Sequence, residues 1–174
     1  DGTEVYIGAI MQHIEEAGIH SGDSACVLPP YKIKSKTIAE IESITSLLAI
    51  EINVKGLINI QFAYKNDELF VLEVNPRASR TTPFVSKTTN VPLAKIAAQL
   101  STGSKLKEYN LPKWDDIKHV AIKEAVLPFN KFPSESIFLS PEMKSTGEVM
   151  GISENFGLSF YKATLSAGTL LPES

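Results

Sequence analysis

Two short segments of alternating apolar and polar residues place the strongest constraint on how this chain can fold. Leu57–Tyr64 and Leu69–Asn75 are separated by four polar residues, 65–68, so we expect them to form an antiparallel hairpin. Side chains on a strand alternate with a period of two, so a slip of one residue would turn each of them to the opposite face. The register of this hairpin therefore decides which polar side chains meet.

The apolar residues of the two segments indicate that register. One face of the first strand carries Ile58, Ile60, Phe62 and Tyr64, and one face of the second carries Phe70, Leu72 and Val74. Aligning the two faces predicts four cross-strand pairs: Phe62 with Leu72, Ile60 with Val74, Gln61 with Glu73, and Asn59 with Asn75. This register requires an odd number of loop residues, so we do not expect a two-residue type I′ turn.

Four oxygen-bearing side chains then share the other face: Asn59, Gln61, Glu73 and Asn75. Mg²⁺ takes oxygen ligands, commonly one or two carboxylates together with phosphate oxygens and water. Arg77 and Arg80 follow the second strand, and arginine pairs with phosphate through a bidentate fork. A carboxylate, amides and arginines together are groups that phosphoryl transfer uses. On these residues alone, a hairpin face that simply meets solvent remains the alternative.

Further elements follow from periodicity and from turn residues. We expect strands at Glu4–Ile14 and His119–Leu127, a loop at Ala17–Ser24, a short apolar run at Ala25–Leu28, helices at Thr37–Asn53, Pro92–Thr102 and Ser153–Ala167, and irregular structure at Pro128–Pro141. Thr37 and Glu40 match a capping box at the start of the first helix. Phe156, Phe160 and Ala163 fall on one side of the last.

Composition excludes several classes of protein. The chain has 174 residues, of which 43% are hydrophobic and 21% charged, as expected for one soluble globular domain. The net charge of −3 implies no basic face, so nucleic acid is not an expected partner. Apolar runs are far shorter than the ~20 residues of a membrane span. The single cysteine, Cys26, fits a reducing compartment, and we expect a cytoplasmic location.

The remaining reactive side chains do not suggest a second site. His13 and His119 lack the spacing to cysteines or carboxylates that a zinc site needs. We interpret Cys26 as a small core residue, because no base for a nucleophile can be identified. The glycines do not form either of the common phosphate-loop motifs.

Several motifs resemble the ATP-grasp domains of the carbamoyl-phosphate synthetase large subunit. They are AGIHSGDSA at 17–25, NIQFA at 59–63 and EVNPRASRT at 73–81, which continues into PFVSK at 83–87. VLPFNKFP at 126–133 and MKSTGEVMG at 143–151 are similar to the second, carbamate-phosphorylating half of that subunit. The resemblance implies an α+β fold with a mainly antiparallel sheet against helices. Residues 1–103 would be an incomplete C-terminal lobe, and 104–174 a following segment packed on it.

The resemblance also implies roles for individual residues. Gln61 and Glu73 would bind nucleotide and hold one Mg²⁺ or Mn²⁺, and Glu73 would share a second such ion with Asn75. Arg77 would face the triphosphate of ATP, and Arg80 would lie near the transferred group or carbamate. The nucleotide would also contact a loop made of Gly18, Ile19, His20 and Ser21. Asn59 receives no role beyond a supporting one.

The implied parent enzyme transfers the γ-phosphoryl group of ATP to carbamate, giving carbamoyl phosphate and ADP, in arginine and pyrimidine biosynthesis. Its partners would be the rest of the large subunit and a glutaminase small subunit. The family's lid and much of its adenine pocket would precede Asp1, so we expect an excised or split piece that is inactive alone. Two alternatives stay open: a biotin-carboxylase-like or peptide-forming ATP-grasp ligase, and a non-catalytic assembly module that keeps the fold.

Overall fold

The computed structural model describes residues 1–134 and 136–169, and it forms two compact units. The first unit consists of Asp1–Ile10 and Lys32–Asp116, and the second of Met11–Tyr31 and the chain from Ile117 onward. Both combine helices with antiparallel strands, so the predicted α+β class is confirmed. The predicted division of the chain into an ATP-grasp lobe at 1–103 and a following segment at 104–174 stays a prediction. Within the described ranges, no helix is long and apolar enough to cross a membrane.

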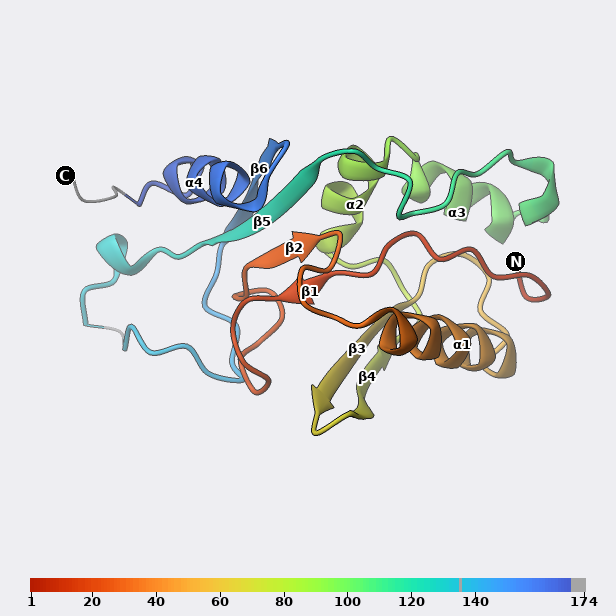
Figure 1. The fold of residues 1–174 in the computed structure, drawn as a ribbon, viewed down its shortest axis with the longest axis horizontal. Coiled ribbons are helices and arrows are strands. Elements are labelled where there is room, and N and C mark those ends of the chain that lie inside the picture. The colour runs from red at the N-terminus through yellow and green to blue at the C-terminus, as the bar shows by residue number, and fades with distance from the viewer. Residues whose placement is uncertain (135, 170–174) are drawn as a thin grey trace. The chain divides into compact units, whose positions relative to one another are not determined.

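The hairpin of the first unit has the predicted register where it matters for the polar face. Strands β3 (Asn59–Lys65) and β4 (Glu68–Asn75) pair Gln61 with Glu73 and Asn59 with Asn75 (Figure 1). The expected pair of Phe62 with Leu72 is wrong. Phe62 lies opposite Val71, and Leu72 is the extra residue of a β-bulge, 56% exposed.

The predicted odd-numbered loop is also wrong, and the bulge explains why. The turn has two central residues, Asn66 and Asp67, with φ values of 53° and 62°. Positive φ at both positions is the pattern of a type I′ turn, which fits the twist of the flanking strands. The single extra residue at Leu72 then restores the register that an even-numbered turn would otherwise shift by one.

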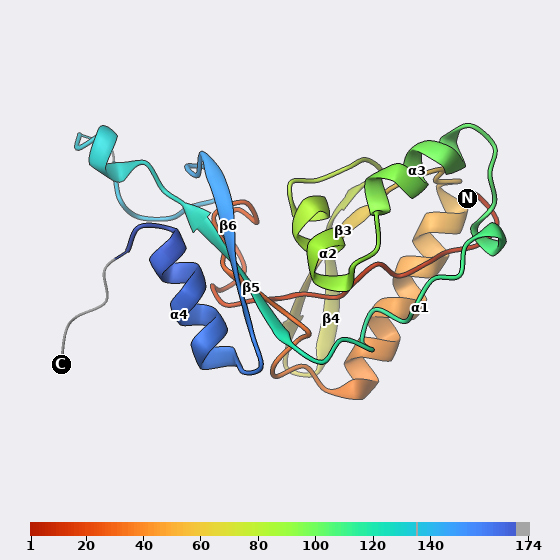
Figure 2. The same cartoon turned by 90° about the horizontal axis from the view of Figure 1, so that it is seen from above.

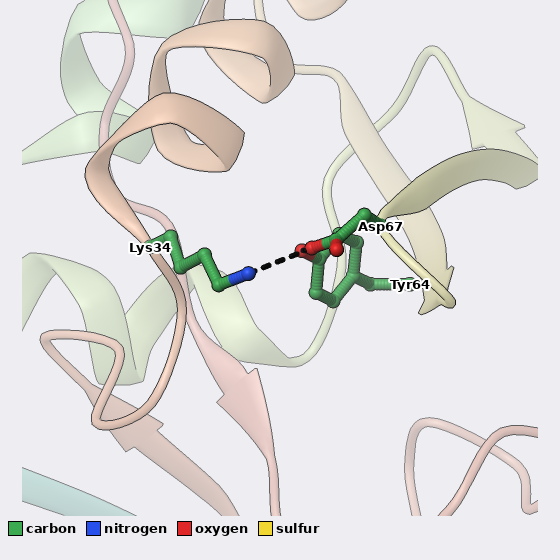
Figure 3. A network of polar contacts seen from close by, with 3 residues as sticks. All are labelled: Lys34, Tyr64 and Asp67. Atoms are coloured by element: carbon green, nitrogen blue, oxygen red, sulfur yellow. Dashed lines mark hydrogen bonds and ion pairs between the residues drawn. The ribbon is translucent and has the colours of Figure 1, made fainter.

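Polar contacts hold the same turn to the chain that precedes helix α1 (Ser35–Glu51). The Asp67 carboxylate accepts a hydrogen bond from Tyr64 Oη at 2.6 Å and forms an ion pair with Lys34 Nζ at 2.8 Å (Figure 3). The hydrogen bond from Lys34, with that from Tyr64, lowers the pKa of Asp67. The predicted capping box of α1 is wrong, because the helix begins at Ser35 and the residue before it, Lys34, makes no side-chain cap.

Helix α3 (Leu93–Ser101) contributes to a small apolar core of the first unit. It confirms the predicted second helix, and it buries Ile96 and Leu100 against Val91. Helix α2 (Thr81–Thr89) was not predicted, because threonine and serine are weak helix formers. A short 3₁₀ turn, η1 (Leu106–Glu108), follows α3. Most of the strand expected at Glu4–Ile14 is not formed, and only Gln12–His13, β1, pairs with a neighbour.

The second unit is a four-stranded antiparallel sheet with one covering helix. Its strand order is β1, β2 (Cys26–Leu28), β5 (Val120–Val126) and β6 (Gly147–Ser153), and a 3₁₀ turn, η2 (Phe129–Lys131), lies between the last two. Strand β6 was not predicted. Helix α4 (Phe156–Ser166), shorter than expected, lies along β5 and β6 (Figure 2). Val27, Ile122 and Ala163 form the core between them.

Gly151 sets how closely α4 can approach β6, which yields a prediction. A Cβ atom at Gly151 would collide with the backbone of α4 at Ser159 O and Ala163 N. We expect Gly151→Ala to lower the free energy of unfolding by about 3 kcal/mol or more, because the helix must move away from the sheet. Gly147→Ala in the same strand is the control, since its Cβ would meet only Val126 Cβ at 3.9 Å. Equal urea midpoints for the two variants would contradict this packing.

Candidate functional site

The polar face of the hairpin brings an amide and a carboxylate into direct contact. Gln61 Nε2 donates a hydrogen bond to Glu73 Oε2 at 2.7 Å. The pair of Asn59 and Asn75 is the next on the same face, because both pairs are directly opposed and two residues apart. Glu73 is exposed to solvent, whereas the three amide residues are half-buried. The structure therefore places the predicted Gln61, Glu73 and Asn75 side by side.

The two predicted arginines lie between the end of β4 and the start of α2. Arg77 Nη2 donates to Asn75 Oδ1 at 3.2 Å, and Arg77 Nη1 donates to the Ala78 carbonyl at 3.0 Å. Arg80 immediately precedes the first residue of α2, Thr81. The N-terminal amides of a helix favour anions, so this corner combines two guanidinium groups with a further source of positive potential.

The donor set on this face fits a hard cation. The hydrogen bond from Gln61 uses its amide nitrogen, and the amide oxygen of Gln61 and both oxygens of Glu73 are of the kind that Mg²⁺ and Mn²⁺ bind. Glu73 is the only carboxylate of the set, so the remaining ligands would be neutral oxygens and phosphate. Among the described residues, no three His, Cys, Asp or Glu side chains gather as a metal-binding group.

The predicted nucleotide loop, Gly18–Ser21, belongs to the second unit. Gly18 is exposed, with φ of 109° and open space around it. His20 is half-buried and held at three points: its N–H donates to Ser140 O at 2.9 Å, its Nδ1 accepts from Gly22 N at 3.0 Å, and its carbonyl accepts from Asp23 N at 2.9 Å. The loop thus has an open beginning at Gly18 and a firmly bonded end.

A buried lysine lies behind this loop. Lys123 is completely buried, and its Nζ donates to the Ser21 carbonyl at 3.3 Å. His13, Cys26, Lys123 and Met150 are successive cross-strand partners in the four-stranded sheet, so their side chains share one face. This face carries ionisable groups in place of a purely apolar core.

Burial governs the ionisation of the groups around Lys123. It lowers the pKa of His13 to about 4, with help from the positive charge of Lys123. It raises the pKa of Glu15 and of Glu124. It also raises the pKa of the Cys26 thiol to about 12, so this buried cysteine is not a nucleophile at neutral pH and packs as the predicted core residue.

Sequence reasoning missed the residue that fixes the end of the loop. The Asp23 carboxylate accepts hydrogen bonds from the backbone N–H groups of Lys144 at 2.7 Å and Ser145 at 2.9 Å. Asp23 lies in the motif at 17–25 and its two donors lie in the motif at 143–151. The pairing of those two motifs is a tertiary contact, and neither motif alone signals it.

Two solved structures share the fold of part of this chain. A biotin carboxylase domain of a single-chain bacterial carboxylase matches 60% of this chain and 26% of that one, at 16% identity and a TM-score of 0.54. A single-chain, multi-domain long-chain acyl-CoA carboxylase matches 58% of this chain and 11% of that one, at 17% identity and a TM-score of 0.52. At this identity the likeness concerns the fold alone.

Sequence comparison identifies the family. Residues 2–109 match the model of the carbamoyl-phosphate synthase L chain, ATP binding domain, and the chain belongs to this family. Relatives described as carbamoyl phosphate synthase large chain are 61% identical over 99% of this chain in Archaeoglobus fulgidus and 60% identical over 96% in Methanothermobacter thermautotrophicus. The chain spans 16% of the length of each of these relatives.

The depressed pKa of His13 predicts a specific pH dependence of stability. Its folded pKa of about 4 lies below the ordinary 6.5. Above pH 6.5 the imidazole is neutral in both the folded and the unfolded chain. As the pH falls from 6.5 toward 4, the unfolded chain binds the proton and the folded chain does not, so the free energy of unfolding falls by roughly 3 kcal/mol at most. Wild type should lose stability relative to His13→Gln between pH 6.5 and pH 4.

Urea unfolding of both proteins at pH 7.5, 5.5 and 4.5 measures this difference. Comparison with the variant cancels the buried carboxylates that titrate in the same range, because both proteins contain them. Parallel stability curves over the whole range would contradict a neutral, buried His13.

Proposed function

We propose that the chain is the part of a carbamoyl-phosphate synthase large chain that helps transfer the γ-phosphoryl group of ATP to carbamate, giving carbamoyl phosphate and ADP. The observation that carries this proposal is the hydrogen bond between Gln61 and Glu73, in register with Asn75 and followed by two arginines. Membership of the family supports it, and so do the names of the relatives. The carboxylases of similar fold support only the ATP-grasp architecture.

The residues of the hairpin would divide the work by charge. Gln61, Glu73 and Asn75 would hold two divalent cations, Mg²⁺ or Mn²⁺, through their oxygens. Such ions, when bound, neutralise charge on the phosphate groups. Arg77, steadied by Asn75 and the Ala78 carbonyl, would orient the triphosphate, and Arg80 would stabilise charge on the transferred group. Gly18, Ile19, His20 and Ser21 would contact the nucleotide.

The partners follow from the same proposal. The chain would work together with the rest of the large chain, since it spans 16% of the relatives' length. A glutaminase small subunit would supply ammonia for the formation of carbamate. The protein would be cytoplasmic, as its single cysteine and its composition also favour.

Glu73→Gln separates a catalytic carboxylate from a structural one. We first consider the longer protein, meaning the complete large chain of which this chain would be a part. There we expect carbamate phosphorylation to fall by about a hundredfold or more, because the only negative ligand on the hairpin face is lost. In the folded chain, stability should change by less than about 1 kcal/mol, since Glu73 is exposed and an amide oxygen can still accept from Gln61. Activity and urea unfolding are measured on the same substitution.

The matched control is Asp67→Asn, which removes the charge of another exposed acid in the same hairpin. It abolishes the ion pair with Lys34, and exposed pairs contribute little, so activity should stay within about twofold of wild type. Two results together would refute the proposed site: Glu73→Gln leaves the longer protein active, and the same substitution unfolds the isolated chain. Glu73 would then be a structural residue.

The isolated chain should make no carbamoyl phosphate. Phosphoryl transfer depends on positioned charge and on the exclusion of water, and the chain spans only 16% of the length of its relative in Archaeoglobus fulgidus. Purified chain is mixed with ATP, Mg²⁺, bicarbonate and ammonia, and ADP is measured beside the longer protein as a positive control. Sustained ADP formation that depends on all four components would show that the chain is sufficient.

A further inference from the structure

Asp23 joins two distant segments through a buried carboxylate. It is 1% exposed, and its two oxygens accept one backbone N–H each, from Lys144 and from Ser145. Ser145 Oγ returns a hydrogen bond to the Gly22 carbonyl at 2.9 Å. These contacts form a reciprocal clamp between residues 22–23 and residues 144–145, all within the second unit.

The clamp extends directly to the loop at 18–21. Asp23 N donates to the His20 carbonyl at 2.9 Å, and the same carbonyl accepts from Ser24 Oγ at 3.3 Å. Gly22, held by Ser145, donates in turn to His20 Nδ1. The orientation of the His20 ring and backbone therefore depends on bonds made by residues 22–24, and these residues are fixed by the carboxylate of Asp23.

The use of a buried carboxylate to close this loop has an energetic cost, and it makes the loop rigid. Removing a charged group from water is unfavourable, and a neutral side chain could satisfy at least one of the two N–H groups. Burial acts to raise the pKa of Asp23, but the hydrogen bonds from Ser145 and Lys144 outweigh it, and the pKa is lowered. Charge-assisted bonds of this kind hold a loop more firmly than neutral ones. A loop already held in one conformation loses less entropy when it binds a ligand.

We propose that Asp23 is a positioning residue, which holds the Gly18–Ser21 loop in the conformation that receives the nucleotide. This inference rests on the proposed function, in which that loop contacts the nucleotide. Asp23 does not itself touch the ligand, because both of its oxygens are engaged with backbone N–H groups and the side chain is shielded from solvent. Its effect is on the binding of nucleotide and much less on the transfer step.

The test uses the longer protein and follows the reverse reaction, in which carbamoyl phosphate and ADP give ATP and carbamate. Asp23→Ala should raise the KM for ADP about tenfold or more, while kcat stays within about threefold of wild type. Asp23→Asn keeps the shape and one acceptor oxygen, so its KM should lie between those of wild type and Asp23→Ala. Ser159→Ala is the control, since it removes a buried hydrogen bond to the Val120 carbonyl in the same unit, far from the loop in sequence.

The comparison with the control decides between positioning and plain stability. A KM for ADP that rises in Asp23→Ala but not in Ser159→Ala, at similar losses of Tm, supports the proposal. Equal KM values in the two variants, or a fall in kcat with KM unchanged, would overturn it. If Asp23→Ala does not fold, Asp23→Asn and Ser145→Ala decide by the same criterion, each with an expected rise of about threefold or more.

Failure of the proposed function has a different signature. Wild-type protein that forms no ATP from ADP and carbamoyl phosphate, or a Glu73→Gln variant as active as wild type, would refute the function itself. A wild-type protein that forms ATP, with Glu73→Gln inactive and Asp23→Ala unchanged in KM, would refute only the role of Asp23.

Discussion

The candidate site depends on the register of one hairpin, and a single extra residue determines that register. The turn at Asn66 and Asp67 fixes the strand ends nearest to it, and from there the pairing runs regularly as far as Phe62 and Val71. Without the bulge, Leu72 would lie opposite Gln61, and Glu73 would project from the other face. Because Leu72 bulges out, the carboxylate returns to the face of Gln61, where the hydrogen bond between them forms.

Alternation predicts the polar half of this hairpin correctly and the apolar half incorrectly, for a physical reason. At the site end, polar Gln61 and Glu73 have apolar neighbours on both sides, so only one alignment keeps Ile60 and Val74 together. At the turn end, Val71 and Leu72 are both apolar, and either could face Phe62 without exposing a polar group. The turn decides between them. Asn66 and Asp67 both have positive φ and form a two-residue turn, and counting from that turn places Val71 opposite Phe62.

Elsewhere, the errors mark places where tertiary contacts override local preference. Glu4–Ile10 has strand-forming residues, but a strand needs a partner to bond to, and only β1 finds one. Strand β6 carries two glycines, which weaken its sequence signal, yet Gly151 is needed there because α4 comes close. Helix α2 begins directly after Arg80, with Pro83 in its first turn, where proline is tolerated.

The two carboxylates that matter most, Glu73 and Asp23, differ in what remains for a ligand. Glu73 is exposed, and the hydrogen bond that Gln61 donates to it comes from a neutral amide. Asp23 is buried, and each of its oxygens accepts a hydrogen bond from a backbone N–H, so the carboxylate connects residue 23 to residues 144–145. The same chemical group is thus open to solvent in the first unit and bonded to distant backbone in the second. Sequence alone suggests the first case, because the register is a local pattern. It cannot suggest the second, because the donors to Asp23 lie 121 and 122 residues away along the chain.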